Sequence, residues 1–265
     1  MYSSFQLARN YLSYYLFSSN GKGHGTHSPF VFDFITKVLN DKTPFPEYKT
    51  VEKLRASMLA DRTVIPVEDF GAGSKSDGGK ERSVRSIAKN AAKPAKFGKL
   101  LFRMARHYHP AHIVELGTSL GITSAYLAMG APGAAVITME GAPAVALRAQ
   151  QNFRTLHLDN ITLVEGNFDD TLANVITGIQ PPDLVFVDGN HRREPTERYF
   201  RQLMTKVHND SLIIFDDIHW SREMEKAWDH IRQDERVRCS IDLFFIGIVL
   251  FRQEFHEKQD FTIRF

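Results

Sequence analysis

The chain has 265 residues, 43% of them hydrophobic and 24% charged, and its 33 basic and 31 acidic side chains give a formal net charge of +2. This composition excludes a disordered chain, and so small a net charge gives no reason to expect a nucleic-acid partner. No apolar run approaches the ~20 residues that span a bilayer. The single cysteine, Cys239, excludes an intramolecular disulfide and a multi-cysteine zinc site.

The first 92 residues show no regular alternation of strands and helices. Helical spacing of apolar side chains predicts a helix over about 5–15, a second from Ser28-Pro29 onward and a third over about 47–60, before a loop with four glycines at 68–83. We interpret 1–92 as a helical cap that contributes to substrate specificity. Its aromatic first helix is expected to pack in the core, with a dimer interface or a membrane surface as alternatives.

Targeting signals are not evident at the start of the chain. Arg9 and Asn10 interrupt the first apolar stretch, where a signal peptide would have an unbroken apolar core. Together with the single cysteine, this predicts a cytoplasmic protein.

Residues 93–265 have a different texture. After an amphipathic helix at 93–109, short runs that are apolar on both faces alternate with segments of helical length, a pattern typical of buried parallel strands. We predict a Rossmann-like, doubly wound α/β domain with a mostly parallel seven-stranded sheet, antiparallel strands within 238–252 and a short last strand at 261–265. The five parallel runs are 112–117, 134–140, 160–166, 183–189 and 211–217.

A glycine-rich turn follows the first parallel strand. Gly117 and Gly121 bracket it, and glycines let the backbone approach a ligand at the start of a helix. Glu140 ends the next strand 23 residues after Gly117, where an acid would bind ribose hydroxyls. The spacing is GxxxG, whereas a dinucleotide site reads GxGxxG. Glu115 lies inside an apolar strand and therefore needs a hydrogen-bond partner.

The pattern E-x-G-x-x-x-G, followed by a strand that ends in Glu, resembles class I S-adenosylmethionine-dependent methyltransferases. The resemblance implies that S-adenosylmethionine is the cofactor and that Glu140 binds its ribose. It further implies two sets of contacts: Glu115, Gly117, Ser119 and Gly121 around the methionine moiety, and Asn167, Phe168 and Asp169 beside the adenine.

Three acids stand at the ends of the fourth and fifth strands: Asp188, Asp216 and Asp217. Taken singly, each fits a helix cap or an ion pair at least as well as a functional role. Taken together, three close carboxylates repel one another unless one is protonated or a cation lies among them. Mg²⁺, Ca²⁺ and Mn²⁺ prefer such oxygen ligands.

The sequences VDG-x-H and FDD-I-x-W resemble the cation-dependent O-methyltransferases of the catechol and caffeoyl-CoA type and their bacterial relatives. The resemblance implies that Asp188, Asp216 and Asp217 hold Mg²⁺ or another divalent cation, with Asp188 beside the cofactor and in the catalytic group. Two positions depart from that family: Asp217 stands where its enzymes have Asn, and His191 stands where the catechol enzymes have a catalytic Lys. A histidine suits the role of general base, and a helix cap or a supporting contact to the metal fits His191 equally well.

We therefore predict an S-adenosylmethionine-dependent O-methyltransferase that acts on a small-molecule hydroxyl with the help of a divalent metal. The alternatives are a nicotinamide-dependent oxidoreductase on a similar sheet, an RNA methyltransferase and a non-catalytic relative that binds the cofactor or scaffolds a partner. The absence of an Asn/Asp-Pro-Pro-aromatic signature at the fourth strand argues against methylation of a nucleic-acid base. The methyl acceptor and the oligomeric state are left open, with a homodimer as one option.

Overall fold

The computed structural model describes residues 1–19, 21–23, 27–68, 81–90 and 93–265. By packing, the chain divides into two compact units: unit 1 comprises 1–40 and 176–265, and unit 2 comprises 41–175. None of the helices in these described ranges has the length and apolar character that crossing a membrane requires.

Unit 1 contains five strands in the spatial order β10-β8-β9-β7-β6. β6 and β7 run parallel, β9 pairs antiparallel with both β7 and β8, and β10 lies parallel to β8. β9 is therefore the one strand of this unit, among the described residues, that runs against the others. The strands are β6 (Leu184–Val187), β7 (Leu212–Asp216), β8 (Cys239–Asp242), β9 (Ile246–Leu250) and β10 (Gln259–Thr262).

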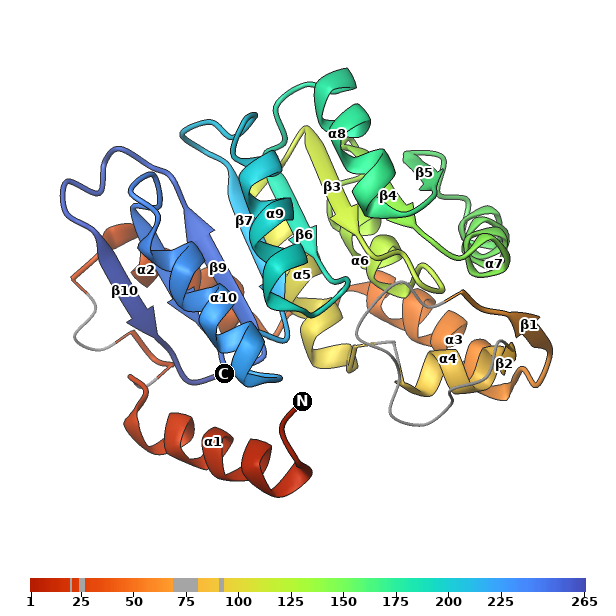
Figure 1. Ribbon diagram of the computed structural model, residues 1–265, viewed down its shortest axis with the longest axis horizontal. Coiled ribbons are helices and arrows are strands. Elements are labelled where there is room, and N and C mark those ends of the chain that lie inside the picture. Colours follow the sequence, from red (N-terminus) through yellow and green to blue (C-terminus); the bar gives the residue numbers. More distant parts are fainter. Residues whose placement is uncertain (20, 24–26, 69–80, 91–92) are drawn as a thin grey trace. The chain divides into compact units, whose positions relative to one another are not determined.

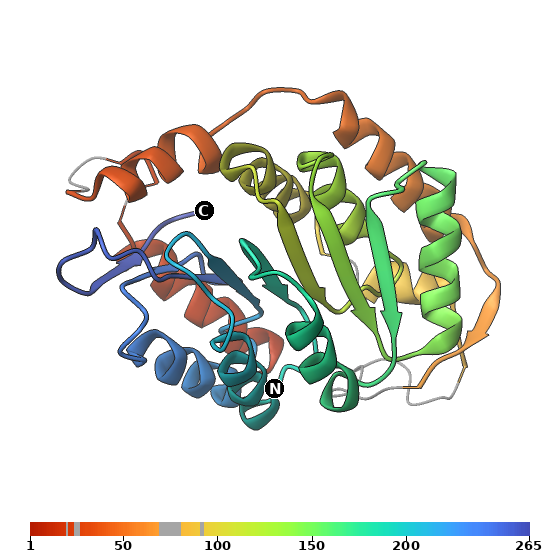
Figure 2. The same ribbon diagram turned by 90° about the horizontal axis from the view of Figure 1, so that it is seen from above.

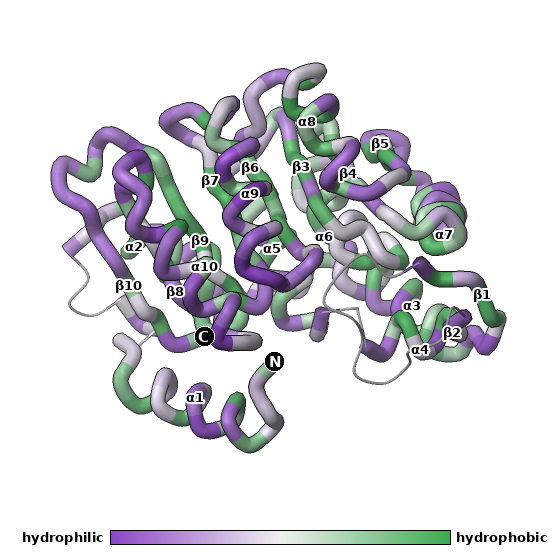
Figure 3. Tube along the Cα trace, in the orientation of Figure 1, coloured by the Kyte–Doolittle hydropathy of each residue, from purple (hydrophilic) through white to green (hydrophobic). Residues whose placement is uncertain are grey.

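β7 and β9 are buried along their whole length, which explains why their sequences are apolar on both faces. Figure 3 shows these strands mostly in hydrophobic colours and α9 and α10 mostly in hydrophilic ones. Trp228 of α10 fills the space over Gly247 of β9, where a Cβ would lie 2.7 Å from the indole ring. The helices of unit 1 are α1 (Ser4–Phe17), α2 (Pro29–Asp33), the π-helical turn η1 (Phe34–Leu39), α9 (Arg193–Leu203) and α10 (Arg222–Gln233).

Unit 2 contains three parallel strands, β3 (His112–Leu116), β4 (Ala135–Glu140) and β5 (Ile161–Glu165), which lie side by side in Figure 2. A small antiparallel pair, β1 (Val64–Pro66) and β2 (Glu81–Ser83), is separate from them. The helices are α3 (Pro46–Ala60), α4 (Val84–Asn90), α5 (Ala95–Tyr108), α6 (Ile122–Gly130) and α7 (Pro143–Thr155), and α8 (Phe168–Gly178) bridges the boundary between the units in the chain. Figure 1 locates these elements.

α5 and α6 pack closely because Gly98 of α5 leaves room for an aromatic ring. A Cβ at Gly98 would lie 2.4 Å from the ring of Tyr126 on α6, and that ring is fully buried. The Tyr126 hydroxyl donates a 2.7 Å hydrogen bond to Glu52 of α3. The helical stripe at 93–109 is thus explained by its contacts with α6, and the packing supports the strand–helix turn that precedes α6.

The predicted α/β fold class, with a mostly parallel sheet and antiparallel C-terminal strands, is confirmed. Among the described residues, eight strands take part in the order of pairing where a seven-stranded sheet was predicted. The short last strand expected at 261–265 is present as β10, which begins two residues earlier. The boundary between a cap at 1–92 and a cofactor domain at 93–265 stays a prediction. Most of the glycine-rich loop at 68–83 lies outside the described residues.

Candidate functional site

The turn after β3 has the backbone geometry that its glycines predict. Gly117 and Gly121 both have positive φ angles, 107° and 77°, and Gly121 is the N-cap residue of α6. A Cβ at Gly121 would lie 2.4 Å from the ring of Phe153 on α7, so a larger residue is excluded by space as well as by φ. Ser119 has a φ of 47°, a conformation uncommon for any residue other than glycine.

Glu140 connects this turn to the end of β4. Its Oε2 accepts a 2.8 Å hydrogen bond from the backbone N–H of Ser119, and its Oε1 accepts a 3.0 Å bond from the N–H of Ala142. Burial raises the pKa of Glu140, and these N–H donors oppose the increase. Each carboxylate oxygen can accept more than one hydrogen bond, so both oxygens retain the capacity to bind ribose hydroxyls.

Glu115 is fully buried in β3, and sequence reasoning missed its partners. Its Oε2 accepts hydrogen bonds from Thr138 Oγ1, at 2.6 Å, and from the Ser124 hydroxyl. The register of β3 on β4 pairs Glu115 with Thr138 and so places them on the same face, a signal available only once that register is known. Its predicted role at the methionine moiety stays a prediction.

The three residues predicted beside the adenine lie at the start of α8. Asn167 Oδ1 accepts a 3.1 Å hydrogen bond from the N–H of Asp169, and the Asn167 carbonyl accepts bonds from the N–H groups of Asp170 and Thr171. Phe168 is the first residue of the helix. These local bonds fix the backbone after β5, while contact with adenine stays a prediction.

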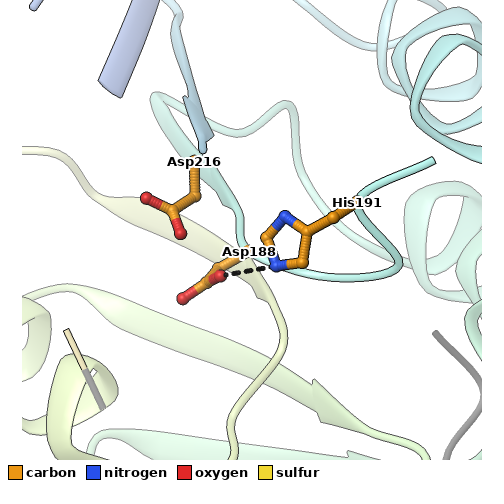
Figure 4. Close-up of side chains that lie close together, drawn as sticks. All are labelled: Asp188, His191 and Asp216. Atoms are coloured by element: carbon orange, nitrogen blue, oxygen red, sulfur yellow. Dashed lines mark ion pairs between the residues drawn. The ribbon is translucent and has the colours of Figure 1, made fainter. Parts of the chain in front are cut away.

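In unit 1, the ends of β6 and β7 bring two acids and a histidine together (Figure 4). Asp188, His191 and Asp216 each offer one ligand atom, and these atoms all lie within 4.8 Å of one another. Asp216 is 1% exposed, and His191 Nε2 lies 3.4 Å from Asp188 Oδ1. The register explains why these acids lie close together: Val187 pairs with Phe215, Asp188 directly follows β6, and Asp216 is the last residue of β7.

Residues that follow β6 and β7 have positive φ angles. Asn190 and His191 have φ angles of 68° and 40°, and Asp217 has a φ of 53°. Positive φ at residues other than glycine is uncommon and gathers at functional sites. Asp217 does not belong to the close group of three; its N–H donates to the Phe245 carbonyl at 2.7 Å, and its role as a metal ligand stays a prediction.

The donor set of this group fits a divalent cation. Two carboxylates close together, one of them buried, repel each other in a site of low dielectric, and a cation relieves the repulsion. Carboxylates suit Mg²⁺, Ca²⁺ and Mn²⁺, and an imidazole adds a ligand that Mn²⁺ and later transition metals accept. In this way the residues present fit the ion that the sequence predicts.

A second histidine, His219, follows this site and is held between two carboxylates. Its Nε2 lies 2.8 Å from Asp242 Oδ2, and its Nδ1 lies 3.4 Å from Glu225 Oε1. Burial alone would lower the pKa of His219, but hydrogen bonds to Asp242 and Glu225 outweigh burial and raise it to about 9. The two carboxylates therefore favour the charged form of His219, and sequence reasoning could not find these partners because they lie on separate elements.

A family model described as a methyltransferase domain matches residues 114–218, from β3 to the turn after β7. No curated protein matches the chain significantly.

Several solved structures share the fold. An S-adenosylhomocysteine-bound methyltransferase of Podospora anserina, PaMTH1, is 16% identical with a TM-score of 0.56, covering 80% of this chain and 99% of its own. An O-methyltransferase of Bacillus cereus in complex with S-adenosylhomocysteine is 18% identical with a TM-score of 0.55, covering 83% and 97%. The S-adenosylmethionine-bound O-methyltransferase TomG of Streptomyces achromogenes, involved in tomaymycin synthesis, is 20% identical with a TM-score of 0.53, covering 62% and 82%.

At these identities the solved structures show the fold, and the family match adds the domain type. The family match runs from the strand that carries Glu115 to the turn that carries Asp217, so it includes both sets of predicted site residues. Residues 114–218 thus match a methyltransferase domain, as the sequence predicted, on a fold that the chain shares with methyltransferases bound to S-adenosylmethionine or S-adenosylhomocysteine.

Proposed function

We propose that the chain transfers the methyl group of S-adenosylmethionine to a hydroxyl oxygen of a small molecule, with a divalent metal held by Asp188 and Asp216. The observation that carries the proposal is the close group of Asp188, His191 and Asp216 at the ends of two neighbouring strands. Its acids and histidine are the groups that would bind a metal and take a proton. The O-methyltransferases of Bacillus cereus and Streptomyces achromogenes that share the fold support this reaction type.

The transfer itself is an in-line displacement. A lone pair of the acceptor oxygen forms the new C–O bond, the S–C bond breaks, and its electron pair remains on the sulfur of S-adenosylhomocysteine. The cofactor supplies the activated methyl group, so the protein has to bind and align the reactants. A bound divalent metal would lower the pKa of the acceptor hydroxyl.

The acceptor proton needs a base, and we assign it to His191. The imidazole of His191 lies 3.4 Å from the Asp188 carboxylate, which orients the ring. A neutral imidazole accepts a proton at its free ring nitrogen, which suits the role of general base. Base catalysis of this kind contributes roughly 10²- to 10⁴-fold in rate.

Cofactor binding is proposed at the turn after β3, with Glu140 on the ribose. Titration of S-adenosylhomocysteine followed by calorimetry tests this part, with binding expected near micromolar, about −8 kcal/mol. Glu140→Ala should weaken binding at least ~10-fold, because a carboxylate that accepts two hydroxyl donors is lost. No binding to the unchanged protein would refute the cofactor assignment and favour a nicotinamide-dependent oxidoreductase or a non-catalytic protein that scaffolds a partner.

Metal binding is tested separately, by the loss of the free Mn²⁺ signal in electron paramagnetic resonance. Asp216→Asn should weaken Mn²⁺ binding at least ~10-fold, since even contacts one step removed from a metal change affinity by that factor. Asp183→Asn is the matched control: Asp183 Oδ1 lies 3.3 Å from His208 Nε2 and forms a similar Asp–His pair away from this group. Equal Mn²⁺ binding by both variants would contradict the metal assignment.

Chelation distinguishes the two halves of the proposal. EDTA should abolish methyl transfer and leave S-adenosylhomocysteine binding largely intact. Unchanged turnover in EDTA would refute the proposed role of the metal and leave the proposed methyl transfer in place. Replacing His191 by Asn should remove the base-dependent limb of the pH–rate profile while Mn²⁺ binding persists; loss of Mn²⁺ binding would make His191 a ligand and not the base.

The remaining assignments concern partners and location. We propose a small-molecule acceptor and no nucleic-acid partner, because the net charge of +2 supplies little attraction for phosphates. A cytoplasmic location fits a chain with one cysteine, which is buried.

A further inference from the structure

The chain makes an uncommon turn between β6 and α9, immediately before the imidazole of His191. The His191 N–H donates a 2.9 Å hydrogen bond to the Gly189 carbonyl, so Gly189, Asn190 and His191 form a three-residue turn. Its central residue, Asn190, has a φ of 68°. A γ-turn with a positive φ at its centre is the rarer and more strained of the two γ-turn forms. Such a turn persists only where the surrounding structure holds it.

The side chain of Asn190 is held by helix α9. Its Nδ2 donates a 3.2 Å hydrogen bond to the hydroxyl of Tyr199, a residue that is fully buried. Within the described ranges of the chain, Asn190 Oδ1 is buried and accepts no hydrogen bond. A buried acceptor without a partner costs stability, and glycine would adopt the positive φ more easily. The stability of the turn therefore does not account for an asparagine at this position, whereas the bond to Tyr199 does.

Helix α9 is in turn fixed to the strand that carries Asp216. The ring of Phe200, the residue after Tyr199, meets the ring of Phe215 edge-on at a centroid distance of 6.1 Å. Phe215 directly precedes Asp216 in β7. The bond from Asn190 to Tyr199 thus ties the turn to the same packed frame that positions the buried carboxylate of Asp216.

His191 lies between two fixed points of the backbone. The γ-turn precedes it, and Arg192, which follows it, is the N-cap residue of α9. The Arg192 carbonyl accepts hydrogen bonds from the N–H and the hydroxyl of Thr196, at 3.1 and 2.7 Å. With the backbone held on both sides, the His191 ring lies 3.4 Å from the Asp188 carboxylate (Figure 4).

We propose that Asn190 and Tyr199 are positioning residues that hold the His191 imidazole against Asp188. The role of His191 as the base rests on the proposed function, whereas its placement by this pair is a matter of geometry alone. A general base has to lie within hydrogen-bond reach of the proton that it accepts. Such groups keep their geometry when their own supports are locked by packing and hydrogen bonds. The bond between Asn190 and Tyr199 supplies such a support from α9.

The position of the His191 ring can be tested without any methyl acceptor, by labelling the full chain with diethyl pyrocarbonate and mapping the sites by mass spectrometry. The His191 side chain is 26% exposed, so a ring released from Asp188 should react faster. Tyr199→Phe removes one hydroxyl and should raise the labelling rate of His191 about 2- to 10-fold, the change in an equilibrium that one hydrogen bond contributes. Asn190→Gly should give a similar increase, because glycine keeps the positive φ and loses the amide. Asn190→Ala should give a larger one, because alanine also disfavours that φ.

His208 serves as an internal control in every sample. Its Nε2 lies 3.3 Å from Asp183 Oδ1 and its side chain is 35% exposed, so it forms a comparable Asp–His pair outside the turn. Its labelling rate should not change in Tyr199→Phe or in the Asn190 variants. Equal acceleration at His208 and His191 would show a general loosening of the fold and would overturn the proposal.

Tyr14→Phe is the matched variant, because it also removes a buried tyrosine hydroxyl of unit 1, the one that donates to the Ile263 carbonyl. It should leave the labelling of His191 unchanged, and circular dichroism checks that each variant is folded. An unchanged rate at His191 in both Tyr199→Phe and Asn190→Gly would show that the pair does not hold the ring, and would refute the proposal.

Methyl transfer to catechol, whose adjacent hydroxyls can chelate a divalent cation, adds a readout of catalysis. Tyr199→Phe should lower kcat about 2- to 10-fold, in step with the labelling, and leave the KM for S-adenosylmethionine unchanged, because the ring acts on the acceptor proton. Faster labelling with an unchanged kcat would refute His191 as the base and leave its placement by Asn190 and Tyr199 in place. A lack of turnover by the unchanged protein would count against the proposed function, while the labelling still decides the positioning.

Discussion

His219 offers the sharpest test of the electrostatics around the proposed metal site. The charged imidazole donates both N–H groups, one toward Asp242 and one toward Glu225, whereas a neutral ring can donate only one. Its pKa is raised from 6.5 to about 9. This difference between the unfolded and folded pKa values corresponds to about 3 kcal/mol in the free energy of unfolding, because the group is largely buried.

The sign follows from linkage. Because the pKa of His219 is higher in the folded protein, the protein stabilises the proton, and this contribution is fully present below pH 6.5 and is lost as the pH rises through about 9. His219→Gln removes the titrating group. The stability difference between the unchanged protein and this variant should therefore be largest near pH ~6 and shrink by about 3 kcal/mol toward pH ~10.

Urea denaturation followed by circular dichroism measures this difference, with EDTA present throughout so that no metal contributes. Proton resonances of the histidine ring give the pKa of His219 directly. Glu225→Gln is an informative companion because it removes one of the two carboxylates, so the pKa of His219 should fall; the loss of stability should then be smaller and should be complete at a lower pH. A stability difference between the unchanged protein and His219→Gln that does not vary from pH ~6 to ~10 would refute the reasoning.

Two further predictions concern packing. Gly121→Ala should lower stability by about 1–3 kcal/mol and weaken S-adenosylhomocysteine binding, because its Cβ would meet the Phe153 ring at 2.4 Å and its φ is positive. Gly133→Ala, with nothing within 4 Å of the added Cβ, should change neither, and equal thermal shifts for the two variants would count against the argument. Burial raises the pKa of the Cys239 thiol to about 12, so iodoacetamide should modify it only after unfolding. Stoichiometric labelling in native buffer would show that the thiol is accessible.

The strands were predictable because their burial leaves a direct trace in the sequence. β7, from Leu212 to Asp216, is buried at every residue, and only a run of apolar residues can form such a strand. The short pair β1 and β2 was not predicted, because its half-exposed residues Val64–Pro66 and Glu81–Ser83 carry no alternation. α4 was not predicted for a related reason, since a helix of seven residues is too short to show a periodic apolar stripe.

The start of the chain shows that apolar spacing predicts a helix without revealing its type. A helix was expected from Ser28-Pro29 onward, and Ser28 does cap α2, accepting from the Val31 N–H at 3.5 Å. The helix then continues as the π-helical turn η1, in which backbone bonds reach one residue further. Apolar spacing cannot reveal this change, because the same buried residues serve either geometry.

Some features of the candidate site could be predicted from the local sequence, and others depend on how distant parts of the chain pair. The sequence identifies Asp188, Asp216 and Asp217 as acids at strand ends. The register then pairs Val187 with Phe215, the residues that directly precede Asp188 and Asp216. Nothing in the letters Asp-Asp tells the two neighbours apart. The distinction comes from the backbone: Asp216 is the last buried residue of β7, and Asp217 begins a turn with a φ of 53°.

His191 is positioned by a turn of the backbone, whereas the two acids are positioned by the strands. It stands outside any strand, and the positive φ angles of Asn190 and His191 turn the chain so that the imidazole lies against Asp188. Asparagine adopts this conformation more readily than most residues, which fits its place before the histidine. A base and a metal ligand need the same proximity to these carboxylates, and they differ in whether the imidazole must be free to accept a proton. Mn²⁺ binding by His191→Asn therefore decides between the two roles.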